Sequence, residues 1–363
     1  MTPPIARPGV MDISPYVGGE SKIPGVDRII KLASNEGAFG PSPKAVEAYA
    51  AAGATLHRYP DGSCTALREA LESVFGYPAD RLVIGAGSDE LITLLCRAYA
   101  GPGDEVLYSY HGFLMYPIAA KSAGATPVTA PETDLCADVD ALLAAVTDKT
   151  RLVFIANPNN PTGTYLTADE LQRLHAGLPD HVVLVIDAAY AEYVSRNDYG
   201  NGDALVRDHA NVVMTRTFSK IFALGGARVG WAYCSAEIAD VLNRVRGPFN
   251  VSSPAQAAAL AALFDRGFLE KSRIHNDTAI AWLSEKLRRA GLIVPDSYCN
   301  FILARFPETG GKTAAAADAF LKSKGIIVRR MAGYKLPDSL RITIGQDDEN
   351  RMVADALATF MAQ

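Results

Sequence analysis

The sequence predicts an α/β protein with a large domain around a mostly parallel sheet and a smaller α+β domain. The chain has 363 residues, enough for roughly two domains. Between residues 81 and 234, short apolar runs alternate with amphipathic helical patterns, as in a parallel sheet covered on both faces. After residue 252 the pattern changes to longer helices and two brief strands. We therefore expect a large domain over 41–252, and an N-terminal arm plus small domain over 1–40 and 253–363.

The individual elements follow from local signals. Ser42 and Pro43 predict a helix start that Gly53 ends, and Thr167 with Glu170 forms a capping box. The segment before residue 40 has little periodicity and is expected to be an arm that packs on another part. Helices are expected over 255–264 and 272–290, with strands over 301–306 and 340–344. In the large domain the expected strands are 81–84, 105–108, 151–155, 182–186, 212–214 and 229–233.

Composition excludes several classes of protein. The chain has 35 Lys and Arg against 40 Asp and Glu. A net charge of -5 does not favour binding to nucleic acid or to an anionic membrane. We expect a small-molecule partner instead. The five cysteines show no CxxC spacing, which favours buried thiols in a reducing compartment over a zinc site, so no metal is expected. The start of the chain has no apolar signal region, and the apolar stretch 255–264 is too short to cross a bilayer. A cytoplasmic location is expected.

Two polar loops follow predicted strands, at the edge where open α/β sheets bind ligands. The first contains Gly87, Ser88 and Asp89 and opens a helix whose free N–H groups suit an anion. Its alternative is an ordinary tight turn with an N-cap serine. The second begins at Asn157 and contains two prolines, which fix an irregular loop while Asn157 offers a donor and an acceptor. This density of constraint favours a positioned side chain.

Two further clusters carry groups that are costly to bury. Asp187 closes the most apolar strand, with Tyr190 close behind; the alternative is a helix N-cap. Lys220 precedes an apolar segment, where burial would lower its pKa toward nucleophilic use; the alternative is a lysine reaching solvent from a helix start. The donors around Lys220 suit a phosphate monoester, and they are Thr217, Ser219 and Arg228.

The last cluster is a pair of arginines, Arg329 and Arg341, that interrupt apolar strands. Such arginines pair with an internal carboxylate or with an anionic ligand, and both alternatives are open. Together the five clusters offer a reactive lysine, an acid partner for a pyridine nitrogen and anchors for a phosphate. These are the needs of pyridoxal 5'-phosphate.

The chain resembles the fold-type I pyridoxal-phosphate enzymes of the aspartate aminotransferase superfamily, and within them the histidinol-phosphate aminotransferases. The resemblance runs from Ser14-Pro-Tyr16 to Arg341. It implies a homodimeric enzyme of histidine biosynthesis that transfers an amino group between L-histidinol phosphate and 2-oxoglutarate. The products would be imidazole acetol phosphate and L-glutamate.

The resemblance also implies a role for each site residue. Lys220 would bind the cofactor covalently and then carry a proton, and Asp187 would pair with the pyridine nitrogen. Tyr190 and Asn157 would hold the ring hydroxyl. Arg341 would bind the substrate's carboxylate or phosphate, assisted by Tyr16 and Arg329, with Asn157 also near the substrate. The remaining cofactor contacts would be Gly87, Ser88, Asp89, Phe113, Thr217, Ser219 and Arg228, with Tyr59 from the neighbouring subunit.

This sequence departs from the family pattern at three places. Where family members often read Asn-Glu-Asn-Pro, it has Asn35-Glu36-Gly37-Ala38, at the mouth of the substrate site. The common Asp-Glu-Ala-Tyr reads Asp187-Ala-Ala-Tyr190, which removes an acid. The stacking ring is Phe113 rather than tyrosine, which keeps the π face and removes a hydroxyl.

Four other functions are compared with this one on sequence grounds, and the transcription regulator is the least favoured. An aromatic amino-acid aminotransferase, alone or with dual specificity, is the main alternative, because the same arginine fits an aromatic amino acid's carboxylate. A phosphothreonine-type decarboxylase shares most of the motifs and would release carbon dioxide. A cofactor-sensing transcription regulator would need a basic helix-turn-helix segment, for which there is no room before Tyr16. A plain α/β binding protein would stay colourless with pyridoxal phosphate.

Overall fold

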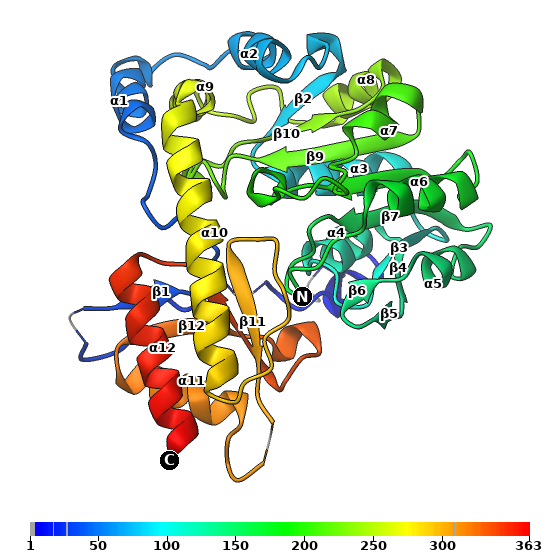
Figure 1. Ribbon diagram of the computed structural model, residues 1–363. Coiled ribbons are helices and arrows are strands. Elements are labelled where there is room, and N and C mark those ends of the chain that lie inside the picture. The colour runs from blue at the N-terminus through cyan, green and yellow to red at the C-terminus, as the bar shows by residue number, and fades with distance from the viewer. Residues whose placement is uncertain (1–3, 17, 27, 308) are drawn as a thin grey trace.

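A seven-stranded sheet forms the centre of the larger part of the molecule (Figure 1). The computed structural model describes residues 4–16, 18–26, 28–307 and 309–363. The strand order is β2-β10-β9-β8-β7-β3-β4, and only β10 runs antiparallel in this sheet. The strands are β2 (Leu82–Gly85), β3 (Glu105–Ser109), β4 (Thr126–Ala130), β7 (Thr150–Ala156), β8 (Val183–Asp187), β9 (Val212–Thr217) and β10 (Gly230–Tyr233).

The predicted α/β class and the mostly parallel sheet are confirmed. Each predicted strand of the large domain is present with ends within three residues of those expected. The edge strand β4 was not predicted, because its sequence, Thr-Pro-Val-Thr-Ala, has one large apolar residue and a proline. A separate two-stranded ribbon pairs β5 (Glu132–Thr133) with β6 (Cys136–Ala137).

Helices cover both faces of the large sheet because successive strand residues point to opposite sides. Along β2, Val83 enters one apolar core, whereas Leu82 and Ile84 enter the other. The Val83 face carries α3 (Ser88–Tyr99), α4 (Met115–Ala123) and α8 (Ala236–Val245). The opposite core receives α1 (Pro43–Ala52), α2 (Thr65–Phe75), α5 (Val139–Ala144), α6 (Ala168–Gly177), α7 (Asp203–Asp208) and α9 (Ser253–Phe264).

Two predicted helix starts are confirmed by their caps. The Ser42 hydroxyl accepts the N–H of Ala45 at 3.2 Å, with Pro43 as the first residue of α1. Thr167 and Glu170 satisfy each other's backbone N–H groups in a full capping box at α6. Each cap removes orphan donors that an isolated helix start would leave unpaired.

A four-stranded sheet forms the second, smaller core. Its order is β1-β12-β13-β11, with β1 (Ile30–Leu32) parallel to β12 (Ile326–Arg330), and with β13 (Ser339–Thr343) antiparallel to β12 and to β11 (Phe301–Arg305). The helices α10 (Arg266–Arg289), α11 (Ala314–Ser323) and α12 (Asp347–Ala362) pack on it. The sequence did not indicate β1, since three residues are too few to show a period.

Helix α10 connects the two cores (Figure 1). It begins at Arg266 rather than at the predicted residue 272. The preceding helix α9 contributes its buried alanines to the core of the large sheet, although it follows the predicted boundary at residue 252. The division at 252 stays a prediction, and the packing of α9 favours a boundary near α10.

Near its start, at Arg7 and Asp12, the predicted arm lies against α4 of its own chain. Arg7 Nη2 donates to the Ser122 carbonyl at 2.6 Å, and Lys121 Nζ donates to the Asp12 carbonyl at 3.0 Å. Residues 1–3 of the arm lie outside the described residues. Among the helices that the structure describes, none has the length and apolar character that a membrane span requires.

Replacing Ile342, which is fully buried in the small core, should lower the free energy of unfolding. Ile342→Ala is expected to cost about 2–5 kcal/mol, because it removes buried methyl groups and leaves a cavity. Ile293→Ala is the matched control: its side chain is 58% exposed, and the expected cost is under about 1 kcal/mol. Urea unfolding followed by tryptophan fluorescence compares the two variants. An equal loss of unfolding free energy in the two variants would contradict the burial of Ile342 in the small core.

Candidate active site

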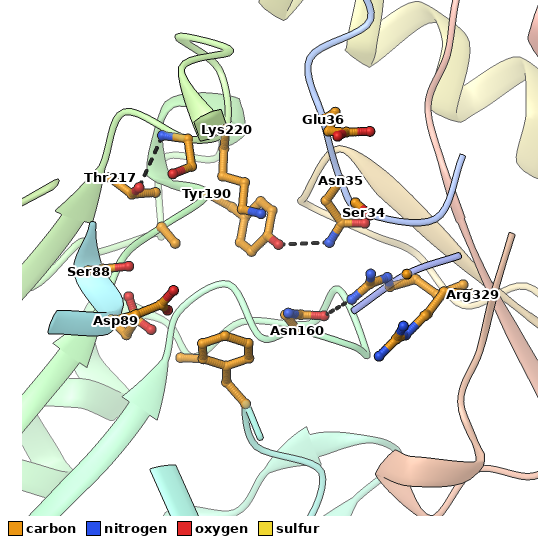
Figure 2. A pocket seen from close by; sticks show the side chains of 18 of the residues that line it. Ser34, Asn35, Glu36, Ser88, Asp89, Asn160, Tyr190, Thr217, Lys220 and Arg329 are labelled. Atoms are coloured by element: carbon orange, nitrogen blue, oxygen red, sulfur yellow. Dashed lines mark hydrogen bonds between the residues drawn. The ribbon is translucent and has the colours of Figure 1, made fainter. Parts of the chain in front are cut away.

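A cavity of about 280 Å³ lies between the carboxyl ends of the parallel strands and the small sheet (Figure 2). Strands that run in the same direction end at one edge of the sheet, so side chains far apart in the sequence meet there. The predicted site residues that line the cavity are Tyr16, Ser88, Asp89, Phe113, Asp187, Tyr190, Thr217, Ser219, Lys220, Arg228, Arg329 and Arg341.

Asp187 is the last residue of β8 and is buried at the floor of the cavity. The Tyr116 hydroxyl donates to Oδ2 at 3.0 Å, and the Thr215 hydroxyl donates to Oδ1 at 2.9 Å. Burial raises the pKa of this carboxyl from 3.8 to about 6, although the two hydroxyl donors oppose the shift. Among the described residues no cation forms an ion pair with it. A cationic group of a ligand in the cavity would therefore stabilise the charged form of this carboxylate.

Lys220 follows β9 and directs its amine into the cavity beside Tyr190 (Figure 2). Its Nζ lies 5.5 Å from the centre of the Tyr190 ring. Burial, with the positive charge of Arg341 second, lowers the pKa of Lys220 from 10.5 to about 8. Roughly a tenth of this amine is therefore neutral at pH 7, far more than for an ordinary lysine, and the neutral form is the one that acts as a nucleophile or a general base.

An anion cradle forms where β2 meets α3. Gly87 has a φ of 85°, which favours glycine, and a Cβ there would lie 2.3 Å from Arg228 Nη2, so a larger residue would displace the guanidinium. Arg228 Nη2 donates to Asp89 Oδ2 at 3.2 Å, and Arg228 Nη1 approaches the Ser219 hydroxyl at 3.4 Å. The free N–H groups at the start of α3 and this guanidinium converge as a phosphate requires.

Arg341 supplies a second anion site, on β13 of the small sheet. The residue is buried, its Nη1 donates to Asn160 Oδ1, and its Nη2 donates to the Ala33 carbonyl at 2.9 Å. Its Nε is buried and has no hydrogen-bond partner among the described residues. A buried donor without a partner is costly, and an anionic ligand in the cavity would remove that cost. Arg329 is its cross-strand neighbour on β12 and lines the same cavity.

Sequence reasoning missed Asn35 and Asn160 as functional residues. Asn35 Nδ2 donates to the Tyr190 hydroxyl at 2.8 Å (Figure 2), and Asn160 holds Arg341. Asn160 stands in the predicted Asn157 loop, and a signal was present there because two Asn-Pro pairs constrain that loop. Asn35 was noted only as part of a departure from the family pattern, since one asparagine in a loop carries no local signal.

Three predicted cofactor contacts, Gly87, Asn157 and Tyr59, are not among the residues that line the cavity. Asn157 is buried beneath it, with Nδ2 donating to the carbonyls of Leu166 and Gly200 and Oδ1 accepting from the Leu166 N–H. Its side-chain amide is thus bonded to the backbone of Leu166 and Gly200, and its contact with the cofactor's ring hydroxyl stays a prediction. Tyr59 is 83% exposed and stacks on Phe249 with 4.7 Å between ring centres, away from the cavity of its own chain.

The donor set fits pyridoxal phosphate group by group. The cradle of Gly87, Ser219 and Arg228 fits its phosphate, and the unpaired Asp187 fits a protonated pyridine nitrogen. Lys220 has the lowered pKa that attack on an aldehyde carbon needs. Phe113 presents a ring to the cavity, which suits stacking on a flat cofactor.

Comparisons with known proteins agree with this chemistry. The sequence matches the family model "Aminotransferase class I and II" over residues 27–357. A histidinol-phosphate aminotransferase of Paramagnetospirillum magneticum is 64% identical over 99% of each chain, and one of Rhodospirillum centenum is 60% identical over 99% of each chain.

A solved histidinol-phosphate aminotransferase of Sinorhizobium meliloti, in complex with pyridoxal-5'-phosphate, has a similar structure. The two superpose with a TM-score of 0.89 at 29% identity, and the match covers 98% of this chain and 97% of that chain. The family model spans most of the sequence, and the relatives match almost all of it at high identity. The chain therefore belongs to the class I and II aminotransferase family.

Proposed function

We propose that this enzyme uses pyridoxal 5'-phosphate to transfer the amino group of L-histidinol phosphate to 2-oxoglutarate, in histidine biosynthesis. The observation that carries the proposal is one cavity with a lysine of lowered pKa and a buried arginine whose Nε lacks a partner. The names of the relatives at 60–64% identity support the same reaction. The products are imidazole acetol phosphate and L-glutamate.

The residues that would hold the cofactor divide by the group they bind. The start of α3, with Gly87, Ser88 and Asp89, and the side chains of Thr217, Ser219 and Arg228 would hold the phosphate. Asp187 would hold the ring nitrogen, Phe113 would stack on the ring, and Tyr190 would donate to the ring oxygen. When bound, the cofactor supplies an electron sink for the carbon that loses a proton.

Lys220 moves the proton in this reaction. Its Nζ is partly neutral near pH 7 because its pKa is about 8. It can therefore take the proton from the substrate carbon that bears the amino group and deliver it to the carbon that was the cofactor's aldehyde carbon. The Asp187 carboxylate keeps a cationic ring nitrogen charged, because a buried negative charge stabilises a neighbouring positive one.

Arg341 lets one site accept two different substrates. Histidinol phosphate carries a phosphate and no carboxylate, whereas glutamate carries two carboxylates. A planar guanidinium binds either anion through two parallel N–H groups, and Arg329 adds a second positive charge beside it. Tyr16 lines the same cavity and can contact the bound substrate.

The active assembly in this proposal is a cytoplasmic homodimer in which each chain supplies Tyr59 to its partner's site. Tyr59 and Phe249 form an exposed, stacked aromatic pair, which is an unusual surface to leave in water. Further exposed apolar side chains lie nearby in sequence, on and after α1, and they are Val46, Tyr49 and Leu56. The absence of a basic surplus agrees with small-molecule substrates and no nucleic-acid partner.

A single-turnover absorbance experiment tests the substrate. The cofactor-loaded protein is mixed separately with L-histidinol phosphate, L-phenylalanine and L-glutamate, and the change in the cofactor's visible band is followed. We expect rapid conversion by histidinol phosphate and by glutamate, and slow conversion by phenylalanine. The reverse order for histidinol phosphate and phenylalanine would make the enzyme an aromatic aminotransferase.

Lys220→Ala tests the covalent and proton-transfer roles. The variant should bind pyridoxal phosphate noncovalently and lose turnover by at least about 10²-fold, because a positioned base contributes that much. Borohydride reduction followed by intact-mass measurement should fix the cofactor to the wild-type protein and not to the variant. Lys149→Ala, at an exposed lysine, is the control and should resemble the wild type. Borohydride labelling of Lys220→Ala would contradict the assignment.

Asp187→Asn tests the buried carboxylate through stability. The folded chain binds this proton more tightly than the unfolded chain, so the free energy of unfolding falls as pH rises from about 4 to above 6. When the cofactor-free protein is measured well above pH 6, Asp187→Asn should therefore raise its Tm. Near pH 4 the substitution should change the Tm little. Pyridoxal phosphate should raise the Tm of the wild type more than that of the variant. Equal stabilisation by the cofactor would contradict the pairing.

Mixed dimers test whether Tyr59 acts in the neighbouring site. Tyr59→Ala and Lys220→Ala should each be impaired alone. A hybrid of the two has one site with both residues intact, so unfolding and refolding an equal mixture should restore about a quarter of the wild-type sites. No recovery, with hybrids demonstrated by native mass spectrometry, would show that Tyr59 does not serve the partner's site.

A further inference from the structure

Asn35 joins the two parts of the molecule at the active site. It follows β1, and its backbone N–H donates to Thr343 Oγ1 on β13 at 2.9 Å. Its side-chain Nδ2 donates to the hydroxyl of Tyr190, which follows β8 in the large sheet, at 2.8 Å. Asn35, Thr343 and Tyr190 are all buried. The side-chain amide of Asn35 therefore links the small sheet to the Tyr190 hydroxyl.

The hydrogen-bond pattern fixes which way this amide points. The Thr343 hydroxyl has one proton, and its oxygen already accepts the backbone N–H of Asn35. Its proton is therefore free to go to Asn35 Oδ1, 3.1 Å away. The amide oxygen thus faces Thr343, and the NH₂ group faces Tyr190. The reverse orientation would aim a second N–H group at Thr343 and deprive the threonine proton of this acceptor.

The backbone at Asn35 suits this arrangement. Its φ is 57°, in the left-handed region that asparagine tolerates better than most residues. Its carbonyl accepts Asn300 Nδ2 at 3.0 Å, and the carbonyl of nearby Ala33 accepts Arg341 Nη2 at 2.9 Å. Several bonds from the small core thus hold the segment, which leaves Asn35 Nδ2 little freedom to move away from the phenol.

A donor on the phenol oxygen decides where the phenol proton goes. Since the Tyr190 oxygen receives the Asn35 N–H, its own O–H remains available to donate into the cavity that Tyr190 lines. Chained hydrogen bonds of this kind also strengthen each other. The other titratable or charged groups that act on the Tyr190 phenol are Cys299, Arg341, Tyr334 and Lys220.

We propose that Asn35 is a positioning residue that, held by Thr343, directs the Tyr190 hydroxyl proton toward an oxygen atom of the bound cofactor. This proposal rests on the proposed function, because the acceptor is the cofactor's ring oxygen. In this role Asn35, which also lines the cavity, acts through Tyr190. The small sheet, which carries Arg341 two residues before Thr343, thereby helps to orient the proton of the phenol.

The test is a pH titration of the visible absorbance of the cofactor-loaded protein. A hydrogen bond donated to the ring oxygen favours its ionised form and lowers the midpoint of the titration. Asn35→Gly removes the amide without adding charge and keeps the left-handed backbone accessible. We expect its midpoint to rise by about 1 pH unit, in the same direction as that of Tyr190→Phe. Thr343→Val should raise the midpoint less, and Thr343→Ser, which keeps the hydroxyl, should restore it.

Two control substitutions lie far from Tyr190, and the outcomes below distinguish this proposal from the proposed function. Gly53→Ala, at the end of α1, and Asn243→Asp, at an exposed position on α8, should leave the midpoint unchanged. Midpoints of Asn35→Gly and Thr343→Val within about 0.2 units of wild type, beside a shifted Tyr190→Phe, would overturn the role of Asn35 alone. A protein that develops no visible band with pyridoxal phosphate would instead contradict the proposed function.

Discussion

The ladder hydrogen bonds of the parallel strands hold their carboxyl ends at one edge of the large sheet, and the active site depends on that alignment. Each strand delivers a different group there: the helix start after β2, Asp187 at the end of β8, and Lys220 after β9. None of these is near another in sequence. Because apolar cores cover the sheet on both faces, these side chains are carried by a closely packed scaffold.

Burial shifts the two principal ionisable groups in opposite senses and brings both within reach of neutral pH. The pKa of Asp187 rises to about 6, whereas that of Lys220 falls to about 8. Desolvation is the main cause for both, since it disfavours the charged form of an acid and of a base alike. Burying these charged groups costs free energy in the absence of a ligand. A ligand with a cationic ring nitrogen, an aldehyde and a phosphate would offset that cost. Arg341 has a buried Nε that lacks a partner among the described residues, and an anionic group of the substrate would supply one.

The small sheet completes the site rather than merely covering it. Arg341 on β13 faces the cavity and holds the Ala33 carbonyl, and Thr343 on the same strand anchors Asn35. The segment after β1 is therefore tied to β13 at successive points while Asn35 reaches across to Tyr190. Anion binding and the orientation of the phenol thus depend on one element. That arrangement gives the small sheet a chemical role in addition to its own hydrophobic core.

The sequence by itself determined the fold class, the predicted strands of the large sheet and most of the site. Their signals are local: apolar runs, caps, and polar residues at strand ends, such as Asp187, Lys220 and Arg228. Only the tertiary structure decided that β1 joins the small sheet, that α9 packs with the large core, and that Asn157 lies beneath the cavity while Asn35 reaches Tyr190. These features depend on hydrogen bonds and packing between segments distant in the chain, such as Asn35 and Thr343, and no local period or motif encodes such a pairing.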